Sequence, residues 1–207
     1  MLFVRHSALL IIASASTSFA GSPNLVINGS FEDSSLDPGS TWSVLGGGNS
    51  SIDGWLTFGG GIDYLGTIIT ASDGIRSIDI NNIFSGGGLQ QTFDTIAGES
   101  YTVAFDMSAN MFGAPNEKIM RVAAGDSSED FVFDYVAAGS TAQDPMWERM
   151  EWSFVATGSS STLSFTGVSS GVYGAALDNV VVTGPVPSPA TLSLIGVAGV
   201  AFGRRRR

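Results

Sequence analysis

Large apolar residues alternate with polar or small ones, at a period of two, along several stretches of this 207-residue chain. In SYTVAFDMSA the large apolar positions are Tyr101, Val103, Phe105 and Met107, and in ERMEWSFVA they are Met150, Trp152 and Phe154. This period places the apolar side chains of each stretch on one face, which is typical of a half-buried antiparallel strand. No segment carries a sustained apolar stripe with the helical period of about 3.6 residues. The pattern therefore predicts an all-β domain.

Glycine-rich breaks such as LGGGNSS, FGGGID and SGGGLQ separate the alternating stretches and predict turns. We expect about nine to eleven strands between Pro23 and Gly184, with no internal repeat and no linker that divides them. Strand-like segments open this region at NLVINGSFED and close it at GAALDNVVVTG. First and last strands of this kind pair in a jelly roll. We therefore predict one domain over residues 21–184, a single antiparallel jelly-roll β-sandwich.

Most catalytic sites cannot be built from the residues that follow position 20. The chain contains no cysteine, and its single histidine, His6, lies in the N-terminal segment. Ser-His-Asp and Cys-His sites are thereby excluded, and no phosphate-binding loop, dinucleotide fingerprint or zinc spacing is present. A glycosidase needs only two carboxylates, and nineteen acidic residues leave such a pair possible. We predict a non-catalytic protein.

Charge is distributed unevenly along the chain. Between the terminal segments, nineteen acidic residues stand against four basic ones, which gives a formal charge of −15 for that region. Such a surface repels nucleic acid and anionic lipid, and it suits a cation, a neutral glycan or a cationic partner. The alternative is that the acidity only keeps an exported protein soluble.

The N-terminus has the three parts of a secretory signal peptide over residues 1–20. A short positive region at Arg5 precedes an apolar run at 8–13, and SFA at 18–20 resembles a cleavage site. A membrane anchor is the weaker alternative because the apolar run is too short to span a bilayer. We therefore expect the protein to be exported.

The C-terminal segment, residues 185–207, also has three parts. The stretch VPSPATL contains two prolines, residues 190–203 are uninterruptedly apolar or small, and four arginines end the chain. As a helix, the apolar run reaches about 21 Å, short of the hydrocarbon core of about 30 Å. We expect a short apolar helix in transient or permanent membrane contact, with the arginines on the cytoplasmic side. A sorting signal and a plain short anchor both stay open.

The three parts of this tail resemble the bacterial PEP-CTERM sorting signal, with Ser188 where glutamate is usual. The resemblance implies processing by an exosortase, a membrane-bound cysteine-dependent transpeptidase. It also implies a place at the cell surface, in the outer envelope or in the extracellular polymer matrix of a Gram-negative-type bacterium.

Eight motifs follow one another between residues 24 and 182: NLVINGSFE, IDGW, GIDYLGT, SDGIRSIDIN, GLQQTF, AGESYTVAFDMSAN, KIMRVAAG and ALDNVVV. In this order they resemble the choice-of-anchor C family, the bacterial branch of domain-of-unknown-function family 642. The resemblance implies a galactose-binding-like β-sandwich related to carbohydrate-binding modules. Plant relatives carry two such domains and cysteine pairs, whereas this chain has one predicted domain and no cysteine.

A structural Ca²⁺ is the cofactor that this resemblance implies, because galactose-binding-like modules often hold one between their terminal strands. Hard oxygen ligands suit Ca²⁺ in an acidic, exported domain. Glu32 and Asp178 are the main candidate ligands, since pairing of the first and last strands would bring them together, and Asn28 is a third. The alternative is that Glu32 and Asp178 only accept backbone hydrogen bonds at the strand ends.

Glycan-binding sites combine an aromatic platform with planar polar groups, and both occur near these motifs. The candidate glycan contacts are Trp55, Asp63, Tyr64, Arg76, Gln91 and Asn110. Neighbours on a strand point to opposite faces, so only one of Asp63 and Tyr64 can face a ligand. Two alternatives stay open: Trp55 anchors the core, and Arg76 pairs with Asp79.

The sequence thus predicts an exported protein that binds extracellular polysaccharide or cell-wall glycan without turnover. The predicted site is a sheet face that carries Asn110, Gln91 and Arg76. No nucleic-acid partner is expected because the domain is strongly acidic. The alternative is a structural protein of the matrix or envelope without a specific ligand.

Overall fold

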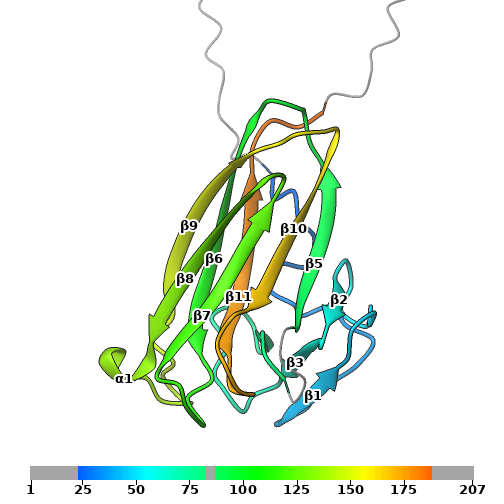
Figure 1. The fold of residues 1–207 in the computed structure, drawn as a ribbon. Coiled ribbons are helices and arrows are strands. Elements are labelled where there is room, and N and C mark those ends of the chain that lie inside the picture. Colours follow the sequence, from blue (N-terminus) through cyan, green and yellow to red (C-terminus); the bar gives the residue numbers. More distant parts are fainter. Residues whose placement is uncertain (1–22, 83–86, 188–207) are drawn as a thin grey trace, which may run out of the picture.

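The computed structural model describes residues 23–82 and 87–187, and within them eleven strands form two antiparallel sheets packed face to face (Figure 1). The first sheet runs in the order β1 (Trp42–Leu45), β3 (Ile62–Leu65), β4 (Ser77–Asp79), β11 (Ala175–Thr183), β6 (Ser100–Ala109) and β9 (Glu148–Val155). The second runs in the order β2 (Leu56–Gly59), β5 (Gly87–Asp94), β10 (Ser160–Gly167), β7 (Glu117–Ala124) and β8 (Ser127–Asp134). The predicted all-β antiparallel sandwich is confirmed.

One helix of four residues, α1 (Tyr135–Ala138), occurs in the described part of the chain. The side chain of Asp134 accepts hydrogen bonds from the backbone amides of Val136 and Ala137, and Gly139 ends α1 at a φ of 73°, a left-handed conformation that glycine adopts without strain. Among the described residues no helix is long and apolar enough to cross a membrane. The predicted signal peptide at 1–20 and the apolar segment at 190–203 lie outside the described residues.

The core lies between the two sheets and is formed by the apolar side chains that alternate along the strands. In β6 the four residues predicted to share a face are all fully buried: Tyr101, Val103, Phe105 and Met107. The Phe105 ring packs edge-on against Phe165 of β10, with 5.4 Å between the ring centroids. Because these rings come from opposite sheets, their burial joins the two layers of the sandwich.

The predicted first strand at NLVINGSFED is not a strand in the structure, since residues 24–33 form bends and turns, but this segment does lie along the last strand, β11. The amide of Leu25 donates to the carbonyl of Val182 at 2.9 Å, and that of Val180 donates to the carbonyl of Gly29 at 2.9 Å. A Cβ on Gly29 would lie only 2.0 Å from the Val180 carbonyl oxygen, so this approach requires glycine. The start and end of the domain are therefore held together by backbone hydrogen bonds.

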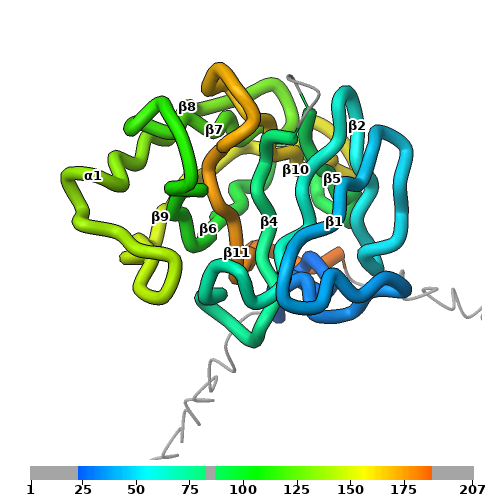
Figure 2. Tube along the Cα trace, turned by 90° about the horizontal axis from the view of Figure 1, so that it is seen from below, coloured from blue at the N-terminus to red at the C-terminus, as the bar shows by residue number. Residues whose placement is uncertain are grey.

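Carboxylates occupy the outer face of the first sheet, under the loop of residues 66–76. Tyr64 points into the core and its neighbour Asp63 points the opposite way, and Asp79 lies directly across from Asp63 on β4. Farther along this face, Asp178 of β11 lies across from Asp106 of β6. Viewed from below, Figure 2 shows the 66–76 loop outside β4 and β11. This loop and the face beneath it form one side of the candidate site.

Candidate functional site

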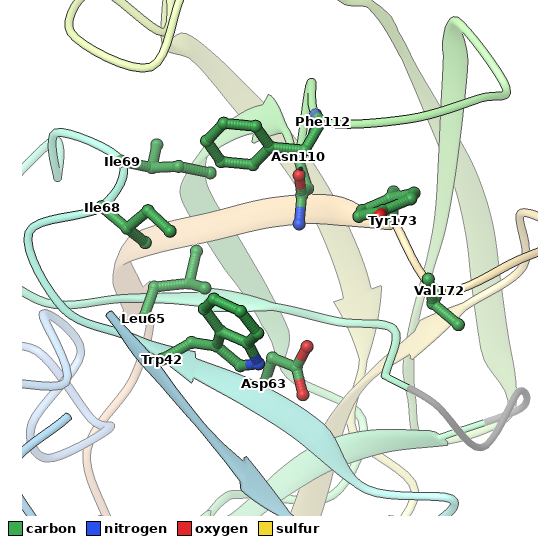
Figure 3. Close-up of a pocket in the computed structure, with 9 residues that line it drawn as sticks. All are labelled: Trp42, Asp63, Leu65, Ile68, Ile69, Asn110, Phe112, Val172 and Tyr173. Carbon is green, nitrogen blue, oxygen red and sulfur yellow. Dashed lines mark hydrogen bonds between the residues drawn. The ribbon is translucent and has the colours of Figure 1, made fainter. Parts of the chain in front are cut away.

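A cavity of about 420 Å³ lies at one end of the outer face of the first sheet. Its walls come from β1, β3, the loop after β3, the segment after β6 and the segment before β11. The residues that line it are Trp42, Asp63, Leu65, Ile68, Ile69, Asn110, Phe112, Val172 and Tyr173 (Figure 3). Mostly apolar walls with a few polar groups are typical of small-molecule sites.

Three aromatic side chains of the cavity are partly open to solvent. Trp42 is 51 % exposed, Phe112 is 53 % exposed and Tyr173 is 37 % exposed. In the view of Figure 3, Trp42 lies on one side of the cavity and Phe112 and Tyr173 lie on the other. Large exposed rings gathered around a concavity mark a surface that can be covered by a ligand.

Asp63 is the acidic group of the cavity. Its side chain is only 9 % exposed, and its Oδ1 atom has no hydrogen-bond partner among residues 23–82 and 87–187. Burial raises the pKa of Asp63 to about 7. A buried carboxylate without a donor is costly, so a ligand that donates hydrogen bonds to it would gain from that contact.

Asp79 and Asn110 connect the floor of the cavity to the loops around it. Asn110 donates from Nδ2 to Asp79 Oδ2 at 2.8 Å and accepts from the amide of Phe112 at 3.0 Å. Asp79 Oδ1 also accepts from the amides of Asn81 and Gly174, both at 2.9 Å. Burial raises the pKa of Asp79 to about 7, and these hydrogen bonds oppose that rise. The pair thus positions the segments that carry Phe112 and Tyr173.

Lys118 of β7 joins the same two segments from below. It is fully buried, and its Nζ donates to the carbonyls of Gly113 and Tyr173, both at 2.7 Å. The Nζ also lies 5.4 Å from the centroid of the Tyr135 ring, a cation–π distance. Burial lowers the pKa of Lys118 to about 8. The sequence analysis assigned no role to Lys118. Its position was nevertheless informative, because Lys118, Met120 and Val122 alternate along β7 and lie on the same buried face.

Of the six residues predicted to contact a glycan, the structure brings Asp63 and Asn110 together at the cavity. Trp55 and Tyr64 lie in the core instead, at 2 % and 0 % exposure. The indole Nε1 of Trp55 donates to the carbonyl of Asn28 at 3.0 Å, and the Tyr64 hydroxyl donates to the carbonyl of Phe31 at 2.7 Å. The alternative that Trp55 anchors the core matches this position.

Gln91 and Arg76 lie away from this cavity. Gln91 points inward and its carboxamide pairs with both backbone groups of Ile27, at 2.8 Å and 3.0 Å. It also lines a second, more open cavity of about 510 Å³ beside the N-terminal segment. Arg76 forms an ion pair with Asp37 at 2.5 Å, and not with Asp79 as one alternative had it. The predicted grouping of Asn110, Gln91 and Arg76 on one sheet face is therefore not what the structure shows.

The three aromatic residues of the cavity were not singled out from the sequence: Trp42, Phe112 and Tyr173. Phe112 and Tyr173 lie in turn segments, within MFGAPNE and GVYG, and Trp42 begins a short strand directly after a turn. An aromatic residue inside a turn has no core face to fill, and that is the signal that could have identified Phe112 and Tyr173. The particular grouping depends on loops that are distant in sequence.

Two of the candidate calcium ligands, Glu32 and Asp178, accept hydrogen bonds from backbone amides of the loop of residues 66–76. Glu32 Oε1 accepts from the amides of Ile75 and Arg76, at 2.8 Å and 2.7 Å. Asp178 Oδ2 accepts from two amides of the same loop, at 2.8 Å and 2.9 Å, and its Oδ1 accepts from the amide of Asn179 at 2.7 Å.

These contacts match the alternative in which the two carboxylates hold backbone amides. The side chain of Asn28 is likewise used, since its Nδ2 donates to the carbonyls of Asp33 and Asp53. Within the described ranges no three acidic or histidine side chains converge as a metal cage. Burial nevertheless raises the pKa of Asp178 to about 7, and a bound cation would favour its ionised form. A structural Ca²⁺ stays a prediction.

The fold and the cavity together define a two-sheet antiparallel β-sandwich domain with an aromatic-walled cavity. The chain belongs to the family described as "Protein of unknown function (DUF642)", whose model matches residues 24–183. Halomucin of Haloquadratum walsbyi is 32 % identical over 181 residues, which cover 83 % of this chain and 2 % of halomucin. The chain thus spans only a small part of that relative.

Solved structures with a similar fold include carbohydrate-binding modules. One of them, in complex with beta-1,4-galactotriose, is 14 % identical, with 79 % of this chain and 100 % of that chain covered and a TM-score of 0.49. A family 35 module from Clostridium thermocellum is 17 % identical, with 62 % and 90 % covered and a TM-score of 0.45. At these identities the likeness concerns the fold alone.

Proposed function

We propose that this domain binds a saccharide, without turning it over, in the cavity between Trp42 and Tyr173. The observation that carries the proposal is the combination of partly exposed aromatic rings with a largely buried carboxylate, Asp63, whose Oδ1 has no hydrogen-bond donor among the described residues. A sugar ring presents apolar C–H faces to aromatic rings and hydroxyl donors to a carboxylate. The volume of about 420 Å³ lies within the range of roughly 300–1,000 Å³ found for small-molecule sites.

The placement of the carboxylates supports binding over hydrolysis. A glycosidase needs two carboxyl groups that flank the scissile bond, roughly 5 to 9.5 Å apart. Asp63 is the single acidic residue among those that line the cavity in the described structure. Its neighbour Asp79 is fully buried and both of its oxygens accept hydrogen bonds from the protein. Asp79 therefore has no free oxygen at the cavity for acid or base catalysis.

Replacement of Trp42 with alanine tests the proposal, because it removes an exposed ring of the cavity. In a polysaccharide screen followed by calorimetry, we expect binding of the wild-type domain and a loss of about tenfold or more in the variant. Val155→Ala, which shortens an exposed side chain on β9, is the control and leaves affinity unchanged. The screen is run with Ca²⁺ and with a chelator, which also tests the predicted cation.

Failure of every polysaccharide to bind would contradict this function and favour a structural matrix or envelope protein. Equal loss in Trp42→Ala and Val155→Ala would also contradict it, because the cavity would then have no special part in binding. Binding that survives in Trp42→Ala would place the ligand elsewhere on the domain.

We further propose that the protein is exported and sorted to the cell surface or extracellular matrix through its tail. The support is in the sequence: a signal-peptide pattern at 1–20 and a proline motif, apolar run and four arginines at 185–207. In a bacterial host with an exosortase, deletion of residues 204–207 is expected to remove the protein from the surface fraction, measured by fractionation and blotting. Arg121→Gln, which removes one positive charge in the domain, serves as the control. Unchanged surface display after the deletion would refute sorting by the tail.

A further inference from the structure

We propose that the cavity selects uncharged sugar rings and excludes uronates, and that Asp63 sets this selectivity. The inference rests on the proposed saccharide binding and adds the chemical class of the sugar. It concerns the group at C6 of a hexose, which is a hydroxymethyl in a neutral sugar and a carboxylate in a uronate.

The first step is the charge of the cavity. Asp63 lies in its wall, and none of the described residues that line it is basic. Lys118 is the buried cation below the neighbouring loops, but its Nζ already donates to the carbonyls of Gly113 and Tyr173. Asp79, directly across from Asp63 on β4, adds a second acid behind the wall. A ligand in this cavity therefore meets the carboxyl group of Asp63, and none of the described lining residues offers a cation.

The second step is the cost of placing a second anion there. A uronate would bring its carboxylate into a partly desolvated space beside Asp63, where like charges repel and no arginine or lysine lies among the described lining residues. A neutral sugar has no such cost. Its hydroxyl groups can donate to the carboxylate of Asp63, whose Oδ1 lacks a donor within the described chain. The same side chain thus favours one class of sugar and opposes the other.

The third step is that aromatic contacts do not discriminate between these sugars. Trp42, Phe112 and Tyr173 would contact the C–H faces of the ring, which are the same in a hexose and in its uronate. Discrimination at C6 must therefore come from a polar group, and Asp63 is the acidic side chain among the described residues that line the cavity. Burial raises its pKa to about 7, so the experiment is made at pH 8, where the carboxylate is mostly ionised.

The test uses oligosaccharides that differ only at C6, paired at equal length: mannose with mannuronate oligomers and galactose with galacturonate oligomers. Isothermal calorimetry at pH 8 measures each affinity for the full domain and two variants. In the wild type, we expect each neutral oligomer that binds to do so about tenfold or more tightly than its uronate partner. Asp63→Asn should reduce this ratio to about threefold or less. Asp126→Asn removes the same charge at an exposed turn and should leave the ratio unchanged.

The outcomes separate the two proposals. If no saccharide of either kind binds, the proposed function itself fails. If uronates bind as tightly as neutral sugars, or if Asp126→Asn lowers the ratio as much as Asp63→Asn, selectivity by Asp63 is wrong while saccharide binding stands. Tighter binding of glucosamine oligomers than of neutral ones would also overturn it, in favour of a cationic ligand. Should Asp63→Asn fail to fold, Asp63→Ser is used to measure the same ratio of affinities for neutral and uronate oligomers.

Discussion

Replacement of Trp55 with alanine is expected to lower the free energy of unfolding by about 3 to 5 kcal/mol, the usual cost of removing a large aromatic side chain from a packed core. Trp55 is 2 % exposed, and its ring lies 5.2 Å from that of Phe31 and 6.3 Å from that of Phe165, centroid to centroid. Its Nε1 also donates to the carbonyl of Asn28, which holds the N-terminal segment against the core. Urea unfolding followed by tryptophan fluorescence and circular dichroism measures the change.

Trp42→Ala is the matched control, since the same residue type is removed from a position that is 51 % exposed. We expect it to change the free energy of unfolding by less than about 0.5 kcal/mol while it weakens saccharide binding. Trp55→Ala is thus expected to lower the free energy of unfolding, whereas Trp42→Ala is expected to lower saccharide affinity. A Trp55→Ala domain that unfolds like the wild type but no longer binds a saccharide would contradict the core position of this residue.

Lys118→Met is the second change with a large expected effect. The methionine keeps an unbranched side chain but leaves the carbonyls of Gly113 and Tyr173 without their donor, so we expect a loss of about 2 to 4 kcal/mol in the free energy of unfolding. Because the same carbonyls belong to the segments that carry Phe112 and Tyr173, saccharide affinity should fall as well. Thermal melts and calorimetry measure the two effects.

Arg121→Met provides the comparison on the same strand. Arg121 faces solvent and pairs with Asp130 on β8, so its loss should leave both stability and saccharide affinity close to wild type. A Lys118→Met domain with wild-type stability would refute the role of the buried ammonium. Reduced stability with unchanged affinity would show that Lys118 supports the fold but does not position the cavity walls.

The fold could be predicted largely from local pattern. The alternation in β6 and β9 is a direct consequence of strand geometry, because side chains two apart share a face whatever the rest of the chain does. The glycine-rich breaks gave the approximate number of strands, and the similarity of the first and last segments indicated that they pair. Tyr101, Phe105 and Trp152 are buried in the core, as the alternation of apolar residues in their strands predicted.

The site could be predicted only in part. Period two limits Asp63 and Tyr64 to opposite faces but does not say which face is covered by the second sheet. The structure buries Tyr64 in the core and leaves Asp63 on the outer face. Gln91 was predicted on a glycan-binding sheet face with Asn110 and Arg76, yet its carboxamide is hydrogen-bonded to the backbone of Ile27, a partner 64 positions away.

By itself, the sequence determined the fold class, the strands with clear alternation such as β6 and β9, and the absence of histidine and cysteine chemistry beyond residue 20, but it wrongly predicted a strand at NLVINGSFED. These properties depend on residue type and on spacing along a single strand. Only the tertiary structure decided that Trp42, Asp63, Asn110 and Tyr173 line one cavity, and that Lys118 holds two of its walls. Those relations join positions up to 131 apart in the chain, where sheet order and loop packing, and not local spacing, decide which side chains meet.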